Sequence, residues 1–263
     1  MKNSKIKNKF FKSTINLIGN KGLGNNIVGK FAKKYLIENC KTNEIVVNGY
    51  KMLLDKNDVM QLSLFDYESV ETEIVKNNVD KNDVVVDVGA NIGYYTLLMA
   101  KNNAFVYSYE PEPTNFDLLK KNVLLNNFSS NVKLYNKAVS NFFGHSKLVL
   151  SEHSTGQHKL VNSRFGTKSI DIEVIKIELD KINFAKIDVE GAELNVLKGM
   201  KTLPNKMLIE FNSMNLEEFG TNPQDFLNFL NNYTIKEISK KGLVEPDYER
   251  LIDNSMATNL FLY

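Results

Sequence analysis

Residues 84–100 read VVVDVGANIGYYTLLMA, and this stretch decides the fold. Its apolar run carries no charge before Asp87, and the chain then turns through Gly89 and Gly93 into a segment with helical apolar spacing. The pattern predicts a short buried strand, a glycine-punctuated turn and a helix. Glycines let a backbone approach a ligand that a Cβ would exclude, and the first turn of a helix directs free N–H groups at that ligand. The stretch therefore predicts a nucleotide-type cradle.

The composition favours one large α/β domain, or a domain with an appended arm. The chain has 263 residues, of which 43% are apolar and 24% charged, enough to bury a sizeable core. A single cysteine and three histidines exclude a disulfide framework and a cysteine-type zinc site. No stretch approaches the ~20 apolar residues that cross a bilayer, and no signal-peptide pattern is complete. We therefore expect a cytoplasmic protein.

The charge is distributed unevenly along the chain. Residues 1–43 contain ten lysines against one acid, a balance of +9, whereas the remainder holds 23 basic and 30 acidic residues, a balance of −7. An acidic body argues against a nucleic-acid partner. The basic arm, with a helix expected over residues 28–38, suggests two hypotheses. It contacts acidic lipids at the inner face of the membrane, or it packs on the domain or on a second subunit.

The rest of the chain, residues 44–263, is predicted to form the main domain. Asn48-Gly49 between two β-prone runs predicts a hairpin over residues 44–55. Alternating strands and helices then predict a doubly wound parallel sheet that binds its ligand at the carboxyl ends of its strands. Residues 146–179 interrupt this rhythm, and we expect an inserted β-hairpin whose polar loop carries His153, His158 and Arg164. The strands are expected at residues 84–88, 104–109, 132–138, 184–189, 207–211, 234–239 and 259–263, with helices over 67–77 and 192–199 and a third helix containing Phe116 and Leu119.

An acidic residue after the second strand suggests what the cradle holds. Glu110 lies 23 residues after Asp87, about where a carboxylate grips ribose hydroxyls in nucleotide-binding sheets. The turn reads Gly-x-Asn-x-Gly, however, and lacks the glycines that let a pyrophosphate settle. The spacing therefore disfavours a nicotinamide dinucleotide and suits S-adenosylmethionine.

A second acidic group follows the fourth predicted strand. Residues 186–193 read KIDVEGAE, and Glu210 ends the next strand. Acids at the ends of adjacent parallel strands converge on the ligand crevice, where they can accept a proton or hold substrate hydroxyls. They could also bind a divalent metal, although no metal site is predicted. Glu193 is equally well explained by its favourable place in the first turn of a helix.

These motifs, DVGANIG at 87–93, YEP at 109–111 and KIDVEGAE at 186–193, together resemble the FkbM family of S-adenosylmethionine-dependent methyltransferases. The resemblance extends from about Tyr67 to the C-terminus. It implies a class I methyltransferase fold, which is a Rossmann-like seven-stranded sheet with its last strand antiparallel. It also implies O-methylation, often of a sugar or glycan hydroxyl.

The resemblance implies roles for individual residues. The cofactor would be bound by the residues of the cradle, the second strand end and the fourth strand end, namely Asp87, Gly89, Ala90, Asn91, Gly93, Glu110, Pro111, Ala138 and Asp188. The resemblance also directs Glu190 toward the acceptor. We expect Glu210, from its place at the end of the next strand, and Arg164, from its place in the polar loop, to bind the acceptor as well. A base must take the hydroxyl proton, and Asp188, His153 and His158 are the candidates.

We therefore predict a methyltransferase acting on a hydroxyl of a saccharide or glycolipid precursor, with a small-molecule natural product or a lipid as alternative acceptors. One rival is a nicotinamide-dependent oxidoreductase, which would need a second phosphate-binding glycine. Another is a catalytically idle scaffold, against which the intact motifs weigh. The sequence leaves the oligomeric state open.

Overall fold

The computed structural model describes residues 43–55, 60, 62, 66–149, 159–160, 169–253 and 257–263. Its contacts divide the chain into two units, residues 1–67 and 68–263. The hairpin predicted over residues 44–55 falls in the first unit, whereas the sequence placed it with the main domain. Within the described residues, no helix is long and apolar enough to cross a bilayer.

The first unit contains the predicted hairpin. Strands β1 (Glu44–Val47) and β2 (Tyr50–Leu53) pair antiparallel. The turn residues Asn48 and Gly49 have φ values of 49° and 78°, and a two-residue turn of this kind requires positive φ at both positions. The Asn-Gly signal is confirmed.

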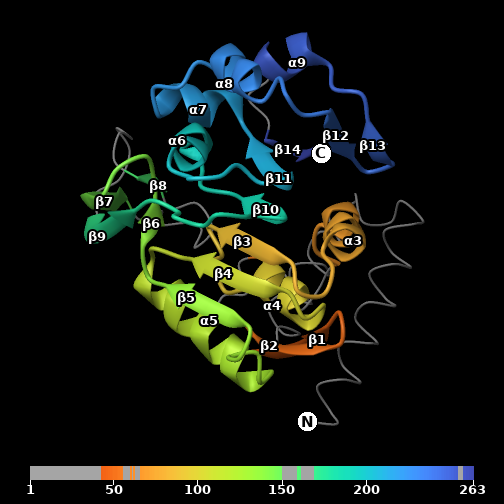
Figure 1. Ribbon diagram of the computed structural model, residues 1–263, viewed down its shortest axis with the longest axis vertical. Coiled ribbons are helices and arrows are strands. Elements are labelled where there is room, and N and C mark those ends of the chain that lie inside the picture. The colour runs from red at the N-terminus through yellow and green to blue at the C-terminus, as the bar shows by residue number, and fades with distance from the viewer. Residues whose placement is uncertain are drawn as a thin grey trace, which may run out of the picture. The chain divides into compact units, whose positions relative to one another are not determined.

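The second unit is built on an eight-stranded sheet with the order β13-β12-β14-β11-β10-β3-β4-β5 (Figure 1). The five strands from β11 to β5 run parallel, and β14 is inserted antiparallel between β11 and β12. The seven strands β3, β4, β5, β10, β11, β12 and β14 form the class I methyltransferase sheet, with the last strand antiparallel as expected. The short β13 adds an eighth strand at the edge. The strands are β3 (Val84–Val88), β4 (Phe105–Tyr109), β5 (Val132–Tyr135), β10 (Phe184–Ile187), β11 (Lys206–Phe211), β12 (Ile235–Ser239), β13 (Gly242–Val244) and β14 (Thr258–Leu262).

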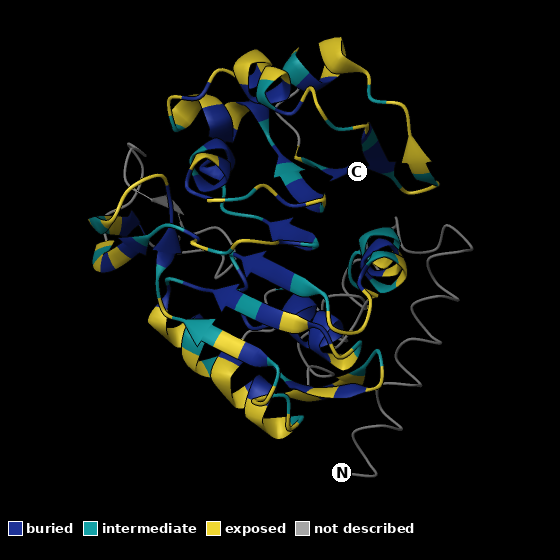
Figure 2. Ribbon diagram, in the orientation of Figure 1, coloured by how far each residue is buried: buried dark blue, intermediate teal, exposed yellow. Residues whose placement is uncertain are grey.

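Helices cover both faces of this sheet, which explains why its central strands are almost continuously apolar. One face of β3, β10 and β11 packs with apolar residues of α6, α7 and α8 in the main core. The helices α3 and α4 pack together on the other face (Figure 1). The central strands are accordingly buried along most of their length (Figure 2). The helices are α3 (Ser69–Asn78), α4 (Tyr94–Lys101), α5 (Pro113–Leu125), α6 (Glu193–Lys198), α7 (Ser213–Glu218), α8 (Pro223–Phe229) and α9 (Tyr248–Asp253).

A second sheet, with the order β6-β9-β7-β8, accounts for the predicted insertion. Its strands are β6 (Ala138–Val139), β7 (Gly144–Val149), β8 (Lys159–Leu160) and β9 (Ser169–Ile175). The antiparallel pairing of β7 with β9 is the expected hairpin. The strand predicted over residues 132–138 is wrong as one element, because β5 ends at Tyr135 and β6 pairs with β9 of this sheet. Between them, the Asn136 amide donates to the carbonyl oxygens of Glu110 and Pro111 at 2.8 and 3.0 Å and fixes a turn.

Candidate functional site

The carboxyl ends of β3, β4, β10 and β11 lie next to one another, because these strands are parallel neighbours. The predicted motifs follow these ends directly: the glycine turn follows β3, Glu110 follows β4 and Asp188 follows β10. The sheet thus brings together residues that are up to about a hundred positions apart in the chain. This is the place where open α/β sheets bind their ligands.

The glycine turn after β3 is held tightly by its own chain. The backbone amides of Gly89 and Ala90 both donate to the carbonyl oxygen of Tyr109, at 3.0 and 3.1 Å. Gly89 has φ +81°, and a Cβ there would lie 1.8 Å from the backbone oxygen of Asp188. Gly93 has φ +97°, and a Cβ there would lie 2.6 Å from the Leu119 side chain. Gly89 is therefore required by the close packing of the turn against the Asp188 backbone, and Gly93 is favoured by its positive φ. The predicted approach of a ligand to this turn stays a prediction.

Glu110 joins the second strand end to this turn. Its Oε2 accepts a hydrogen bond from the Asn91 backbone amide at 2.7 Å, and its Oε1 accepts one from the Glu112 amide at 2.9 Å. The residue is 5% exposed. Burial raises the pKa of Glu110 to about 7, although the two amides act in the opposite direction. The Asn91 side-chain oxygen is also buried, and no described residue donates to it.

Asp87 lies beneath the turn and faces α4. Its Oδ2 accepts a hydrogen bond from the Thr96 hydroxyl at 2.5 Å, and that hydroxyl also lies 2.5 Å from the Ser108 hydroxyl. Burial raises the pKa of Asp87 to about 6. Through its hydrogen bond with Thr96, the Asp87 side chain connects the end of β3 to α4. Its predicted contact with the cofactor stays a prediction.

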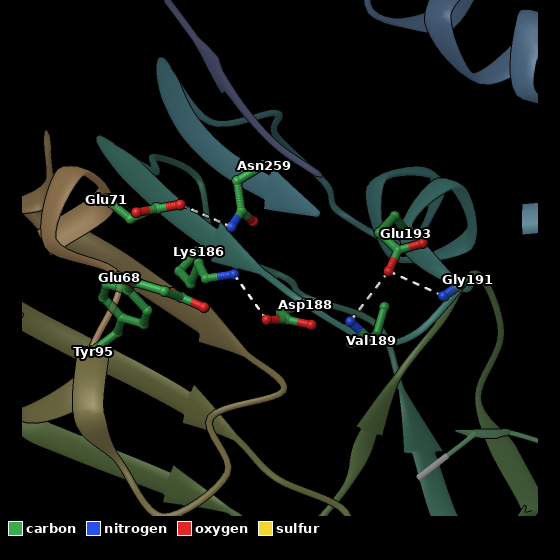
Figure 3. A network of polar contacts seen from close by, with 9 residues as sticks. All are labelled: Glu68, Glu71, Tyr95, Lys186, Asp188, Val189, Gly191, Glu193 and Asn259. Atoms are coloured by element: carbon green, nitrogen blue, oxygen red, sulfur yellow. Dashed lines mark hydrogen bonds and ion pairs between the residues drawn. The ribbon is translucent and has the colours of Figure 1, made fainter. Parts of the chain in front are cut away.

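A buried lysine pairs with Asp188 after β10. The Lys186 Nζ donates to the Asp188 Oδ2 at 3.0 Å, and the two side chains are 3% and 31% exposed (Figure 3). Lys186 also faces the ring of Tyr95 on α4, 5.6 Å from its centre. Burial favours the neutral amine, but Asp188, Glu68 and Glu210 outweigh it and raise the pKa of Lys186. The lysine is therefore charged within a group of acids.

Two further carboxyl groups lie close to that of Asp188. One oxygen each of Asp188, Glu190 and Glu210 lies within 4.8 Å of the others. Burial and then the charges of Asp188 and Glu190 raise the pKa of Glu210 far above its usual range, so Glu210 is protonated at neutral pH. Its Oε2 is buried without a hydrogen-bond partner among the described residues. Such a group can hold the hydroxyls of a ligand, and its spacing is compatible with a divalent ion.

Glu193 has a structural role that the sequence left undecided. It is 1% exposed, and its Oε1 accepts hydrogen bonds from the backbone amides of Val189 and Gly191 at 3.2 and 3.1 Å (Figure 3). Burial raises its pKa to about 7. Glu193 therefore closes the turn that carries Glu190.

The structure describes only some of the remaining predicted site residues. Pro111 follows Glu110, and Ala138 is buried at the start of β6, close in sequence to the turn at Asn136. His153, His158 and Arg164 lie outside the described residues, as does the arm up to residue 42. Their predicted roles stay predictions.

The profile of the methyltransferase FkbM domain matches residues 87–236. The chain belongs to the FkbM methyltransferase family. The match begins at Asp87 and includes the cradle, Glu110 and the acidic motif, so the predicted family is confirmed.

Individual relatives agree with this assignment. The chain is 30% identical over 161 residues to methyltransferase sdnD of Sordaria araneosa, covering 47% of this chain and 62% of that protein. It is 31% identical over 169 residues to the hexuronic acid methyltransferase AglP of Haloferax volcanii, covering 61% of this chain and 67% of that protein. The chain thus spans less than two-thirds of the length of sdnD. SMU.1697c of Streptococcus mutans, crystallised in complex with SAH, superimposes with a TM-score of 0.44 at 12% identity, covering 74% of this chain and 95% of that one. The fold assignment rests on the sheet order described above.

Several residues of the site were not singled out from the sequence. Lys186 stands within a quoted motif, and a lysine inside a buried apolar strand is itself a signal. Glu68 belongs to the Tyr67-Glu68 pair that also resembles the family, but the sequence assigned it no role. Tyr95 and Asn215 gave no signal, because only the folding of the sheet brings their helices to the acidic cluster.

Proposed function

We propose that this FkbM-family protein transfers a methyl group from S-adenosylmethionine to a hydroxyl group of a saccharide. The observation that carries the proposal is the position of Glu110, held against the cradle turn by the Asn91 amide at 2.7 Å. This position supports the proposal because a buried carboxylate at the end of the second parallel strand can accept hydrogen bonds from ribose hydroxyls.

The residues of the cradle fit this cofactor in chemical terms. Glu110 supplies acceptor oxygens for the ribose, and the unpaired side-chain oxygen of Asn91 can accept from the amino group of the methionine part. The turn reads Gly-x-Asn-x-Gly and lacks the glycine that lets a pyrophosphate settle, which argues against the nicotinamide alternative. When bound, S-adenosylmethionine supplies a methyl group on a positively charged sulfur atom.

The acidic cluster suits the acceptor. Lys186 binds one oxygen of Asp188, which fixes the carboxylate and leaves its other oxygen to take the hydroxyl proton. Glu190 and the protonated Glu210 can orient further hydroxyls of the acceptor, Glu190 as an acceptor and Glu210 as a donor. Alignment of the attacking oxygen is the main contribution that such a site can make.

A saccharide acceptor is supported by the name of the relative AglP, a hexuronic acid methyltransferase. The name of sdnD specifies no acceptor, and a natural product or a lipid stays an alternative. The arm's contact with the membrane and a cytoplasmic location also stay predictions.

Two measurements test the proposal. Calorimetry should show binding of S-adenosylmethionine and of its product SAH but not of NADH, and Glu110→Ala should weaken binding at least about tenfold. The protein is incubated with methyl-labelled S-adenosylmethionine and cell extract, and the mixture is then fractionated. The glycan fraction should carry the label. Binding of NADH alone would refute the cofactor, and label confined to protein would refute the saccharide.

A further inference from the structure

The turn between β10 and α6 holds a glutamate in a backbone conformation that glutamate disfavours. Glu190 has φ +56°, in the left-handed region that is reached easily by glycine and by asparagine. Five of the seven described non-glycine residues with positive φ are asparagines, and the others are Glu68 and Glu190. A turn selected only for its shape would be expected to carry glycine or asparagine at position 190.

The backbone of this turn is fixed from two sides. Glu193 Oε1 accepts hydrogen bonds from the amides on either side of Glu190, those of Val189 and Gly191 (Figure 3). Gly191 has φ +109°, and a Cβ there would lie 2.4 Å from the backbone oxygen of Asn215. The turn is therefore clamped by α6 and seated against α7.

The side chain of Glu190 is fixed as well. The side-chain amide of Asn215 donates to Glu190 Oε2 at 2.9 Å. Asn215 is 6% exposed, and its own backbone amide donates to the Asn212 side chain that caps α7, at 3.2 Å. A buried residue on a capped helix thus determines the direction of the carboxylate.

This arrangement opposes stability. It brings the Glu190 carboxylate within 4.8 Å of the Asp188 carboxylate, where like charges repel, and within the same distance of the buried Glu210 carboxyl group. Backbone strain that the surrounding structure enforces is concentrated at functional sites. We propose that Glu193 and Asn215 are positioning residues, which hold Glu190 in its strained conformation so that its carboxylate contacts the methyl acceptor. This inference rests on the proposed function.

The experiment compares four variants with the wild-type protein. Glu190→Gly removes the carboxylate and relieves the strain. Asn215→Ala removes the side-chain amide that donates to the Glu190 carboxylate. Glu193→Leu removes the acceptor that clamps the turn, and Glu193→Gln keeps an acceptor oxygen as the matched control. Each is measured for its Tm, for SAH affinity by calorimetry, and for the rate of label transfer from S-adenosylmethionine to the extract fraction that the wild type labels, as that fraction is diluted.

A fifth variant, Glu190→Ala, loses the same hydrogen bond from Asn215 but keeps the strained backbone conformation. We expect the Tm of Glu190→Gly to lie about 2 °C above that of Glu190→Ala, while transfer by Glu190→Gly at limiting acceptor falls at least about tenfold. Asn215→Ala and Glu193→Leu should lose transfer to a similar extent, Glu193→Gln should retain most of it, and SAH affinity should change less than about twofold in all four. Glu190→Asn, which also tolerates positive φ, replaces Glu190→Gly if that variant does not fold.

Wild-type transfer rates in Glu190→Gly, or in both Asn215→Ala and Glu193→Leu, would overturn the proposal. A Tm of Glu190→Gly that is no higher than that of Glu190→Ala would show that the conformation is not strained, which also overturns it. Failure of the wild type to bind SAH or to transfer label would instead refute the proposed function, and this inference with it.

Discussion

Glu110 occupies a site that changes the proton affinity of its carboxyl group. Its pKa is raised to about 7, chiefly because the group is 5% exposed. The ionised form is the better acceptor for ribose hydroxyls. Acidification through pH 7 should therefore weaken cofactor binding. We expect the affinity for SAH to be about tenfold lower at pH 6 than at pH 8.

Isothermal titration at a series of pH values measures this dependence. Glu110→Gln should bind SAH more weakly and with little dependence on pH between 6 and 8. Glu112→Gln should keep this dependence but move it to lower pH, because Glu112 is an adjacent buried acid that caps α5 and whose charge helps to raise the pKa of Glu110. An unchanged affinity across this range in the wild type would contradict the assignment of Glu110 to the cofactor.

Residue roles could be predicted from the sequence only where they depend on the spacing within one βα unit. The position of Glu110 at the end of β4 was predicted this way, because its distance from Asp87 follows from the lengths of one turn, one helix and one strand. Asn215 could not be found, since its contact with Glu190 spans 25 residues and depends on how α7 packs. The glycine turn was located correctly but explained incompletely, because the backbone of Asp188 that fills the space beside Gly89 belongs to a distant strand.

At the scale of elements, the strands were more predictable than the short helices. The buried parallel strands have continuous apolar runs, which the sequence shows directly. Helices α7 and α8 have only six and seven residues, too few for helical periodicity to be visible. They are instead begun by capping asparagines, Asn212 and Asn222. The break between β5 and β6 was missed because it depends on the tertiary hydrogen bonds of Asn136.

Two glycine substitutions test how the β3–α4 turn is built. Gly89 and Gly220 have nearly the same φ, +81° and +82°, but a Cβ at Gly220 would meet nothing within 4 Å. Gly220→Ala should therefore cost only the conformational penalty, about 1 kcal/mol of unfolding free energy. Gly89→Ala should cost more than about 3 kcal/mol, because the Cβ also forces the ends of β3 and β10 apart. Urea unfolding measures both, and equal losses would show that the close packing at Gly89 is unimportant.

For the whole molecule, buried acids make stability depend on pH in an unusual direction. Burial raises the pKa of Asp87 to about 6 and those of Glu110 and Glu193 to about 7. The folded state therefore binds more protons than the unfolded state between the usual carboxyl range and pH 7. Stability is then highest at the acidic end of this window and falls as the pH rises through the folded-state values. Glu210 keeps its proton in the folded state throughout the window, whereas its carboxyl is ionised in the unfolded state, so it adds to the same downward slope.

We expect the free energy of unfolding to fall by at least about 2 kcal/mol between pH 5 and pH 8, as measured by urea unfolding across this range. Glu110→Gln should reduce the slope, because a neutral amide no longer loses a proton inside the protein. Asp180→Asn is the matched control: Asp180 is an exposed acid whose pKa is lowered by its hydrogen bond and ion pair with Lys201, so its replacement should leave the slope in place. A stability that is constant or rises from pH 5 to pH 8 would mean that the buried carboxyls are ionised at lower pH than their environment requires. The acidic residues at the strand ends would then not be held in a low-dielectric site, and the arguments from the raised pKa values of Glu110 and Glu210 would fail with them.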